Sequence, residues 1–236
     1  MHPQFISGAK GNLFALHRDP DAPSPSGTVI IVPPFGEEMN RTRIVMTRVA
    51  EDIARAGYHS IAFDLSGTGD SAGDLDDTRW SDWLQDLTTL IDWSTAEHKQ
   101  PISLLGIRLG GLLAAEISKN RPCQKLILWN AVTDGSAYIS HLQRIARVTK
   151  FNERENGASQ NKKRPELGRG LTVLGYTLNR GLIDDISKAH LNVFNDVSTL
   201  HLDSPTPPYW ALEAPVSMSG LIDETIRFLK ALSVVI

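Results

Sequence analysis

The chain has 236 residues, a formal net charge of -3 and 41% hydrophobic residues. This length suits one substantial core, so a single domain over 1–236 is expected. Because acidic and basic residues nearly balance, the chain lacks the positive electrostatic potential that attracts nucleic acid, and no nucleic-acid partner is expected. One cysteine excludes a disulfide framework, and no apolar stretch approaches the about 18 residues of a membrane span, so a cytoplasmic protein is expected.

The chain opens with a predicted β-hairpin, in which two short apolar-rich runs, 4–7 and 12–17, surround Gly8 and Gly11. The run TVIIV at 28–32 is β-branched, which is typical of a strand buried on both faces of a parallel sheet. Three later runs predict further strands: HSIAFDL, ISLLGI and KLILWNA.

Helical patterns separate these strands. The first has apolar residues four apart over 45–53 and ends at Gly57, the second covers 80–91 with Asp77 or Thr78 as its N-cap, and the third is LGGLLAAEISK. Strand and helix alternate four times, which predicts a parallel sheet with helices on both faces.

Beyond Ala131 the pattern is weaker. A helix is expected over 141–150 and a mobile polar loop over 152–168, so the stretch 135–170 is interpreted as a lid-like or mobile insertion. A last helix is expected over 220–231, with its apolar residues on one face.

One turn between a strand and a helix carries the functional argument. Gly106-Ile107-Arg108-Leu109-Gly110 has glycines where the tight turn of a GxSxG nucleophile elbow needs small residues. Arg108 stands where that motif has its serine. Because a guanidinium stays protonated, it is neither a nucleophile nor a base, and ordinary serine-hydrolase chemistry is not expected.

Two further loops resemble those of α/β-hydrolases. PPFGEEMNR resembles the HGxGE loop of lysophospholipase-like enzymes, and DLSGTGDSAGD resembles their DxxGxGxSxG loop. Together with WSDWLQDL, LLGIRLGGLLAAE and LILWNAV, they resemble the exosortase A system-associated hydrolases of the second type, found beside bacterial exopolysaccharide and PEP-CTERM protein-sorting genes. Arginine at the elbow also resembles that family's pattern.

The resemblance covers residues 4–146 and implies an α/β-hydrolase fold, with a mostly parallel twisted sheet shortened at its C-terminal edge. It implies that the backbone N–H groups of Phe35 and Leu109 form an oxyanion hole, and that a substrate would be an ester or thioester. No cofactor is expected, and no metal motif such as HExxH is present.

Arg108 has two interpretations. Its guanidinium is paired internally with Glu37, Glu38 or Asp134, or it joins the positive end of the following helix to bind an exchangeable carboxylate or phosphate.

The acid and histidine of a catalytic triad have weaker candidates. Asp134 follows the LILWNA strand, where this fold can hold a triad acid, although an aspartate there more often caps a loop. The histidine must follow the elbow, which leaves His141, His190 and His201, and only His201 is near the C-terminal region expected to carry it. PTPPYW, which resembles the family's histidine loop, contains none.

Ser66 and Ser71 are alternative nucleophiles in the glycine-rich loop, where serines more often stabilise turns. Three functions therefore remain open. In the first, the chain is a catalytically reduced hydrolase relative that binds an acyl, carboxylate or phosphate ligand or a partner. In the second, it is an active hydrolase with a water held by Arg108, the oxyanion hole and Glu38 or Asp134. In the third, it is a structural component without a ligand.

Overall fold

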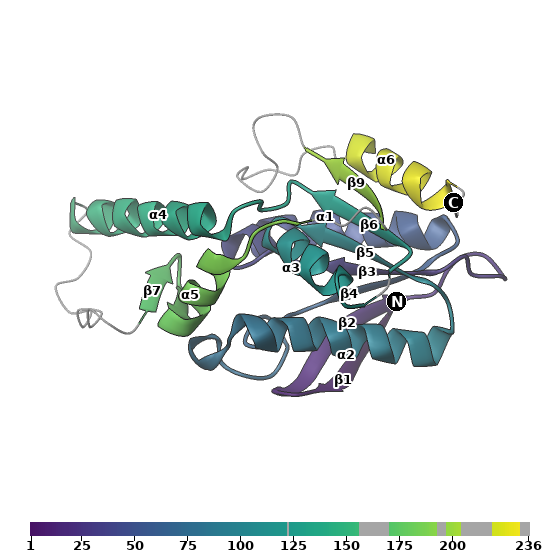
Figure 1. Ribbon diagram of the computed structural model, residues 1–236, viewed down its shortest axis with the longest axis horizontal. Coiled ribbons are helices and arrows are strands. Elements are labelled where there is room, and N and C mark those ends of the chain that lie inside the picture. Colours follow the sequence, from purple (N-terminus) through teal and green to yellow (C-terminus); the bar gives the residue numbers. More distant parts are fainter. Residues whose placement is uncertain (122, 156–169, 193–196, 204–218, 232–236) are drawn as a thin grey trace.

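The computed structural model describes residues 1–121, 123–155, 170–192, 197–203 and 219–231, which form a layered α/β molecule (Figure 1). Its elements, in chain order, are β1 (His2–Gly8), β2 (Gly11–Arg18), β3 (Thr28–Val32), α1 (Glu37–Arg55), β4 (His59–Phe63), the 3₁₀ turn η1 (Leu75–Asp77), α2 (Trp80–His98), β5 (Ile102–Ile107), α3 (Leu109–Ser118), β6 (Lys125–Trp129), α4 (Gly135–Glu155), β7 (Gly170–Val173), β8 (Tyr176–Asn179), α5 (Arg180–Lys188), β9 (Ser198–Leu202) and α6 (Ser219–Lys230).

The main sheet has seven strands in the order β1-β2-β4-β3-β5-β6-β9. Strands β4, β3, β5, β6 and β9 run parallel, and β1 and β2 form the predicted antiparallel hairpin at one edge. The chain leaves β3 for β4 on one side and later returns to β5 on the other. In such a sheet the crevice for a ligand lies beyond the carboxyl ends of the strands where the order reverses, here β3 and β5.

Helices cover both faces, which confirms the expected α/β-hydrolase architecture. On one face α1 and α6 pack against the central strands, and on the other α2 and α3 do so, joined by residues of α4 and α5. Every residue of β3, β5 and β6 is buried, because these strands are covered on both sides. That burial explains their uninterrupted apolar sequences.

Helix α2 begins later than its predicted cap. Residues 75–77 form the turn η1 and Thr78 is extended, so Arg79 is the N-cap, and Asp77 or Thr78 was the wrong prediction. The Arg79 N–H donates to Asp82 Oδ2 at 2.8 Å, and the Thr78 carbonyl accepts a hydrogen bond from Asn179 Nδ2 at 2.7 Å.

The helix predicted at 141–150 is part of the longer α4, which extends beyond the main sheet beside β7 (Figure 1). The start of the loop predicted for 152–168 is therefore helical as far as Glu155, and its remaining residues lie outside the described ones. The C-terminal helix predicted at 220–231 is confirmed as α6. None of the helices in the described part of the chain is long and apolar enough to cross a membrane.

Candidate functional site

The candidate site lies at the carboxyl ends of β3 and β5. Phe35 follows β3 and precedes α1, whereas Arg108 joins β5 directly to α3. The first turns of α1 and α3 therefore both begin at this crevice. Because backbone N–H groups at a helix start favour negative charge, two helix N-termini make this end of the sheet attractive to an anion.

Arg108 adopts the strained backbone of a nucleophile elbow, with φ 53° and ψ −119°. Its N–H donates to the Trp129 carbonyl at 3.0 Å, and its own carbonyl accepts from Gly111 N at 3.0 Å and Val132 N at 3.1 Å. A side chain on Gly106 or Gly110 would overlap neighbouring backbone atoms. The glycine pattern therefore does form the tight turn that the sequence predicts.

The Arg108 guanidinium is turned inward and bonded within the protein. Its Nε donates to Glu38 Oε1 at 3.1 Å, and Nη1 donates to the Asn130 carbonyl at 2.8 Å. The two side chains of the ion pair are only 16% and 15% exposed. Of the expected partners, Glu38 is thus bonded to Arg108, whereas Glu37 pairs with Arg41 at 3.2 Å.

Glu38 is a buried carboxylate between a cation and a phenol. Tyr138 on α4 donates a hydrogen bond to Glu38 Oε2 at 3.4 Å. Burial raises the pKa of Glu38, and the charge and hydrogen bond of Arg108 offset that rise only in part. The pKa of Tyr138 is raised well above its usual value by burial and by the nearby carboxylate, so the phenol stays a hydrogen-bond donor.

The two backbone groups proposed for the oxyanion hole are the N–H groups that flank the elbow and the start of α1. Among the described residues, neither the Phe35 N–H nor the Leu109 N–H donates a hydrogen bond. Both remain available to an oxygen atom placed at the crevice. Whether they act together on one oxyanion remains a prediction from the family resemblance.

A small cavity of about 50 Å³ is lined by Glu38, whereas Arg108 is not among its lining residues. Its walls come from the start of α1, from α4 and from the β7–β8 hairpin, and the polar groups among them include Glu37, Glu38, Tyr138, His141 and Tyr176. A water occupies about 30 Å³ of liquid, and pockets for drug-sized ligands measure roughly 300–1,000 Å³. The cavity therefore has room for a head group of a few atoms.

His141 is the histidine that the structure brings to this cavity. Its pKa is lowered by burial and by the positive charges of Arg144 and Arg108. His201, the sequence candidate, instead lies within β9 opposite Leu128 and is exposed. The PTPPYW segment lies outside the described residues.

The candidate acid Asp134 caps a helix. Its Oδ1 accepts the Ala137 N–H at 2.9 Å near the start of α4, and Oδ2 lies 4.0 Å from His190 Nδ1. Asp203, which the sequence analysis missed, directly follows β9, and its Oδ1 accepts a hydrogen bond from Asn130 Nδ2 at 3.1 Å. Because Asn130 also contacts Arg108, Asp203 is linked to the elbow through one residue. The sequence signal for Asp203 was an aspartate directly after the short strand in LHLDSP.

The alternative serine nucleophiles are used in loop structure. Ser66 Oγ donates to Asp86 Oδ1 at 2.8 Å and is buried. Ser71 Oγ donates to the Asp64 carbonyl at 2.6 Å and accepts the Phe14 N–H at 2.9 Å. These bonds match the turn-stabilising interpretation.

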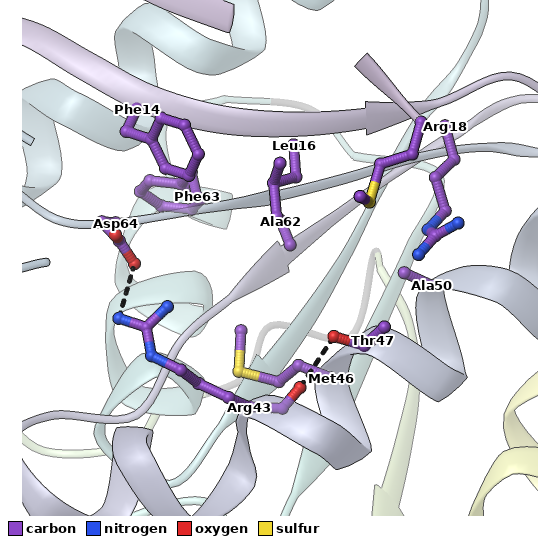
Figure 2. Close-up of a pocket in the computed structure, with 11 residues that line it drawn as sticks. Phe14, Leu16, Arg18, Arg43, Met46, Thr47, Ala50, Ala62, Phe63 and Asp64 are labelled. Atoms are coloured by element: carbon purple, nitrogen blue, oxygen red, sulfur yellow. Dashed lines mark hydrogen bonds and ion pairs between the residues drawn. The ribbon is translucent and has the colours of Figure 1, made fainter. Parts of the chain in front are cut away.

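A second, larger cavity of about 120 Å³ lies between β2, β4 and α1 (Figure 2). Arg43 and Arg18 are among its lining residues, together with apolar side chains such as Phe63. Arg43 is 3.6 Å from Asp64, and Arg18 is 3.1 Å from Glu51. Both cations thus face a carboxylate, as Arg108 does, but this cavity is not at the carboxyl ends of β3 and β5.

Comparisons with known proteins agree with this fold. Over 152 residues the chain is 29% identical to the human (Homo sapiens) palmitoyl-protein thioesterase ABHD10, mitochondrial, a match that covers 61% of this chain and 45% of that protein. The bovine (Bos taurus) protein is 29% identical over 122 residues, 52% of this chain and 38% of its own length. The matches thus span less than half of these curated relatives.

Solved structures are similar over most of the chain. Est1E from Butyrivibrio proteoclasticus superposes with a TM-score of 0.64 at 17% identity, over 95% of this chain and 96% of that one. Mouse alpha/beta hydrolase domain-containing protein 10 gives 0.51 at 19% identity, over 85% and 77%. Residues 23–164 also match the family described as serine aminopeptidase, S33. With this match over more than half of its length, the chain belongs to the serine aminopeptidase S33 family of α/β-hydrolases.

Proposed function

We propose that this protein is a non-hydrolytic α/β-hydrolase that binds, rather than cleaves, a short acyl or other carboxylate- or phosphate-bearing ligand at Arg108. The observation that carries the proposal is the guanidinium at the elbow, partly buried and bonded to Glu38 and the Asn130 carbonyl. A permanent cation occupies the position from which a serine would attack.

The surroundings of Arg108 favour a small anion. The helix starts of α1 and α3 and the N–H groups of Phe35 and Leu109 offer donors, and the cavity of about 50 Å³ that Glu38 and Phe35 line admits a head group. A long acyl chain would need α4 or the β7–β8 hairpin to move. We therefore regard these elements, which form the cavity walls, as a lid.

Glu38 would compete with such a ligand for Arg108. Because burial raises its pKa, Glu38 can take up a proton and then no longer attracts the guanidinium as a carboxylate does. A ligand carboxylate would then replace it. Binding should tighten as the pH falls, as long as the ligand itself stays ionised, and should be accompanied by proton uptake.

We further propose that the protein serves a bacterial exopolysaccharide and protein-sorting system. The support is that both partners of the ion pair come from motifs that resemble the exosortase A system-associated hydrolases. Glu38 lies in PPFGEEMNR and Arg108 in LLGIRLGGLLAAE.

An active hydrolase is the second candidate, favoured by the raised pKa of buried Glu38 beside Tyr138 and near His141. Such a carboxylate could hold a water as a general base. The name of the ABHD10 relatives would then suggest a thioester substrate.

The first experiment tests catalysis with a fluorophosphonate probe and a series of short- and long-chain p-nitrophenyl esters and thioesters. Wild type, Arg108→Ala, Arg108→Ser and Glu38→Gln are compared. We expect wild type to be unlabelled and inactive. Ester hydrolysis by wild type that is lost in both Arg108→Ala and Glu38→Gln would instead establish the second candidate.

The second experiment measures binding of acetate, butyrate, hexanoate and phosphate by calorimetry between pH 6 and 8. Glu38→Gln removes the competing charge and should tighten carboxylate binding about tenfold, whereas Arg108→Ala should abolish it. Glu37→Gln removes a neighbouring carboxylate that pairs with Arg41, and serves as the matched control. If neither wild type nor Glu38→Gln binds any of these anions, the ligand-binding proposal is wrong and the interpretation as a structural component remains.

A further inference from the structure

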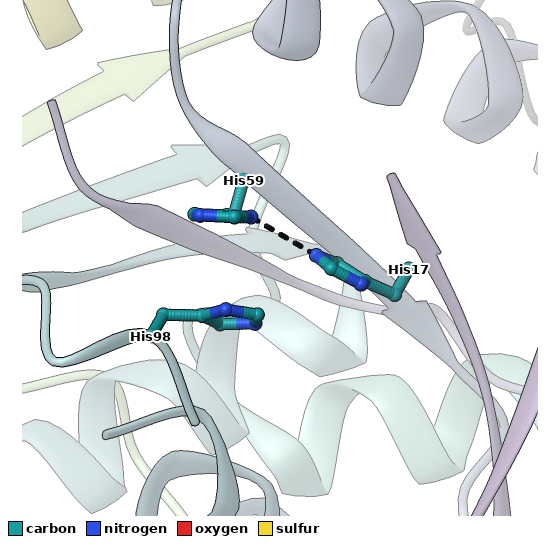
Figure 3. A group of neighbouring side chains, drawn as sticks. All are labelled: His17, His59 and His98. Carbon is teal, nitrogen blue, oxygen red and sulfur yellow. Dashed lines mark hydrogen bonds between the residues drawn. The ribbon is translucent and has the colours of Figure 1, made fainter. Parts of the chain in front are cut away.

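Three histidines from separate parts of the chain meet at the end of the sheet opposite Arg108 (Figure 3). His17 lies near the end of β2, His59 is the first residue of β4, and His98 is the last residue of α2. His59 pairs in register with Thr28 at the start of β3, so the group lies at the amino ends of the parallel strands. Arg108 follows the carboxyl end of β5, and the two sites are therefore distinct.

The ring nitrogens are spaced like ligands of one ion. His17 Nε2 lies 3.0 Å from His59 Nδ1, and one nitrogen from each of the three rings lies within 4.8 Å of the others. Two nitrogens bound to tetrahedral Zn²⁺ at about 2.0 Å are separated by about 3.3 Å. The rings of His59 and His98 are stacked, with centroids 4.0 Å apart and planes 16° apart, so the His98 ring must rotate out of this stack for its nitrogen to point at the same ion.

A carboxylate lies beside two of the three rings and is the candidate for a fourth ligand. Asp19 Oδ1 lies 3.6 Å from His17 Nε2 and 3.7 Å from His59 Nδ1. The other oxygen, Oδ2, is 3.1 Å from His2 Nε2, a contact that orients the carboxylate. Metal-binding sites commonly hold their ligands in place through such outer partners.

A buried ring nitrogen supports the same assignment. The Nε2 atom of His98 is buried and, in the described part of the chain, has no hydrogen-bond partner. A buried polar atom without a partner is costly, and a bound ion would satisfy it.

We propose that His17, His59, His98 and Asp19 bind a divalent transition-metal ion, for which Zn²⁺ is the best fit. Imidazole and carboxylate ligands suit this ion, and four protein ligands leave no open position, which is the arrangement of a structural site. The ion would join the end of β2, the start of β4 and the end of α2, and so fasten the hairpin edge of the sheet to a covering helix.

The test uses tag-free protein stripped of metal with a chelator and titrated with Co²⁺ and then Zn²⁺. We expect one equivalent of Co²⁺ to give the intense visible bands of tetrahedral coordination, Zn²⁺ to displace it, and Zn²⁺ to raise the melting temperature. These readouts do not depend on any enzymatic activity or on Arg108.

Two ligand variants and one control make the test specific. His98→Gln and Asp19→Asn should each weaken Co²⁺ binding at least tenfold, and Asp19, which is 58% exposed, can be changed without disturbing the core. His190→Gln removes a histidine elsewhere and should leave binding unchanged. No saturable Co²⁺ binding by the wild type, or one-to-one binding that survives both ligand variants, would overturn the proposal and leave the cluster as stacked core histidines.

Discussion

Arg108 shows how a single residue can keep the geometry of a catalytic turn while losing its chemistry. A positive φ on a residue other than glycine costs on the order of 1–3 kcal/mol, and Arg108 retains it because three backbone hydrogen bonds fix the turn. In this conformation the Arg108 side chain reaches Glu38, to which its Nε donates a hydrogen bond. The strained backbone of a nucleophile elbow thus positions an arginine for an ion pair.

This strain can be measured by comparing Arg108→Gly with Arg108→Ala. Both changes remove the guanidinium and leave Glu38 without its cation, but only glycine adopts φ 53° freely. Arg108→Gly should therefore be more stable than Arg108→Ala by about 1 kcal/mol in urea unfolding. Equal stabilities would mean that the turn relaxes when its side chain is truncated. Ala72→Gly, compared with wild type, changes a loop position outside the elbow. The difference in their free energies of unfolding gives the cost of an alanine-to-glycine change alone.

At the scale of elements, Lys125 anchors α6 to the sheet. It is the first residue of β6, is 3% exposed, and its Nζ donates to the carbonyls of Phe228, Leu229 and Ala231 at the end of α6. A cation at a helix C-terminus satisfies carbonyls that have no partner within the helix. This contact bridges parts of the chain about a hundred residues apart.

Lys125→Met keeps the aliphatic stem but leaves these carbonyls without a donor. We expect a loss of about 2 kcal/mol in the free energy of unfolding, since hydrogen bonds to a charged group contribute about 1.5–3 kcal/mol. Hydrogen exchange should show reduced protection in α6 first. Lys230→Met, which changes an exposed lysine of the same helix, is the control, and equal effects of the two variants would contradict the anchoring role.

The sequence predicts the first half of the fold because its strands are uniformly apolar and its helices have a clear period. The β7–β8 hairpin was not predicted, because its turn carries Leu174 and Gly175, both at positive φ. Asn-Gly is the usual signal for such a turn, and this sequence has leucine where that signal has asparagine. LHLDSP was interpreted as the end of a strand, but the place of β9 in the sheet was not predicted, because the strand is only half-buried at the edge and lacks a period.

The candidate site was predicted in part for a similar reason. The elbow glycines are local signals, so the position of Arg108 and three carboxylates as partners could be inferred, and Glu38 is the one bonded to it. His141 reaches the cavity only because α4 folds over the crevice, which no local pattern specifies. The cluster of His17, His59 and His98 depends on sheet register and has no motif spacing.

At the scale of the whole molecule, buried carboxyl groups set how stability depends on pH. Burial raises the pKa of Glu38, Asp64 and Asp86, that of Asp86 to about 6. A carboxyl group with a raised pKa binds its proton more tightly in the folded state than in the unfolded chain. Each such group therefore makes the folded protein less stable as the pH rises from its unfolded pKa to its folded pKa.

Asp86 tests this effect most sharply because its neighbours tolerate an amide. Its Oδ2 accepts the Ser66 N–H and its Oδ1 accepts the Ser66 hydroxyl, both at 2.8 Å. In Asp86→Asn the amide oxygen can accept the first bond and the amide NH₂ can donate to the Ser66 oxygen. The substitution thus removes the buried charge without removing its hydrogen bonds.

We expect Asp86→Asn and wild type to be equally stable below pH 4, and the variant to be more stable above pH 6 by up to about 3 kcal/mol, the equivalent of a shift of about two pKa units. Urea unfolding followed by tryptophan fluorescence from about pH 3 to 8 measures the difference. Asp76→Asn, which changes an exposed carboxyl in η1, should not alter the slope. If the two curves stay parallel across this range, Asp86 is already ionised at pH 4 and its bonds to Ser66 outweigh its burial.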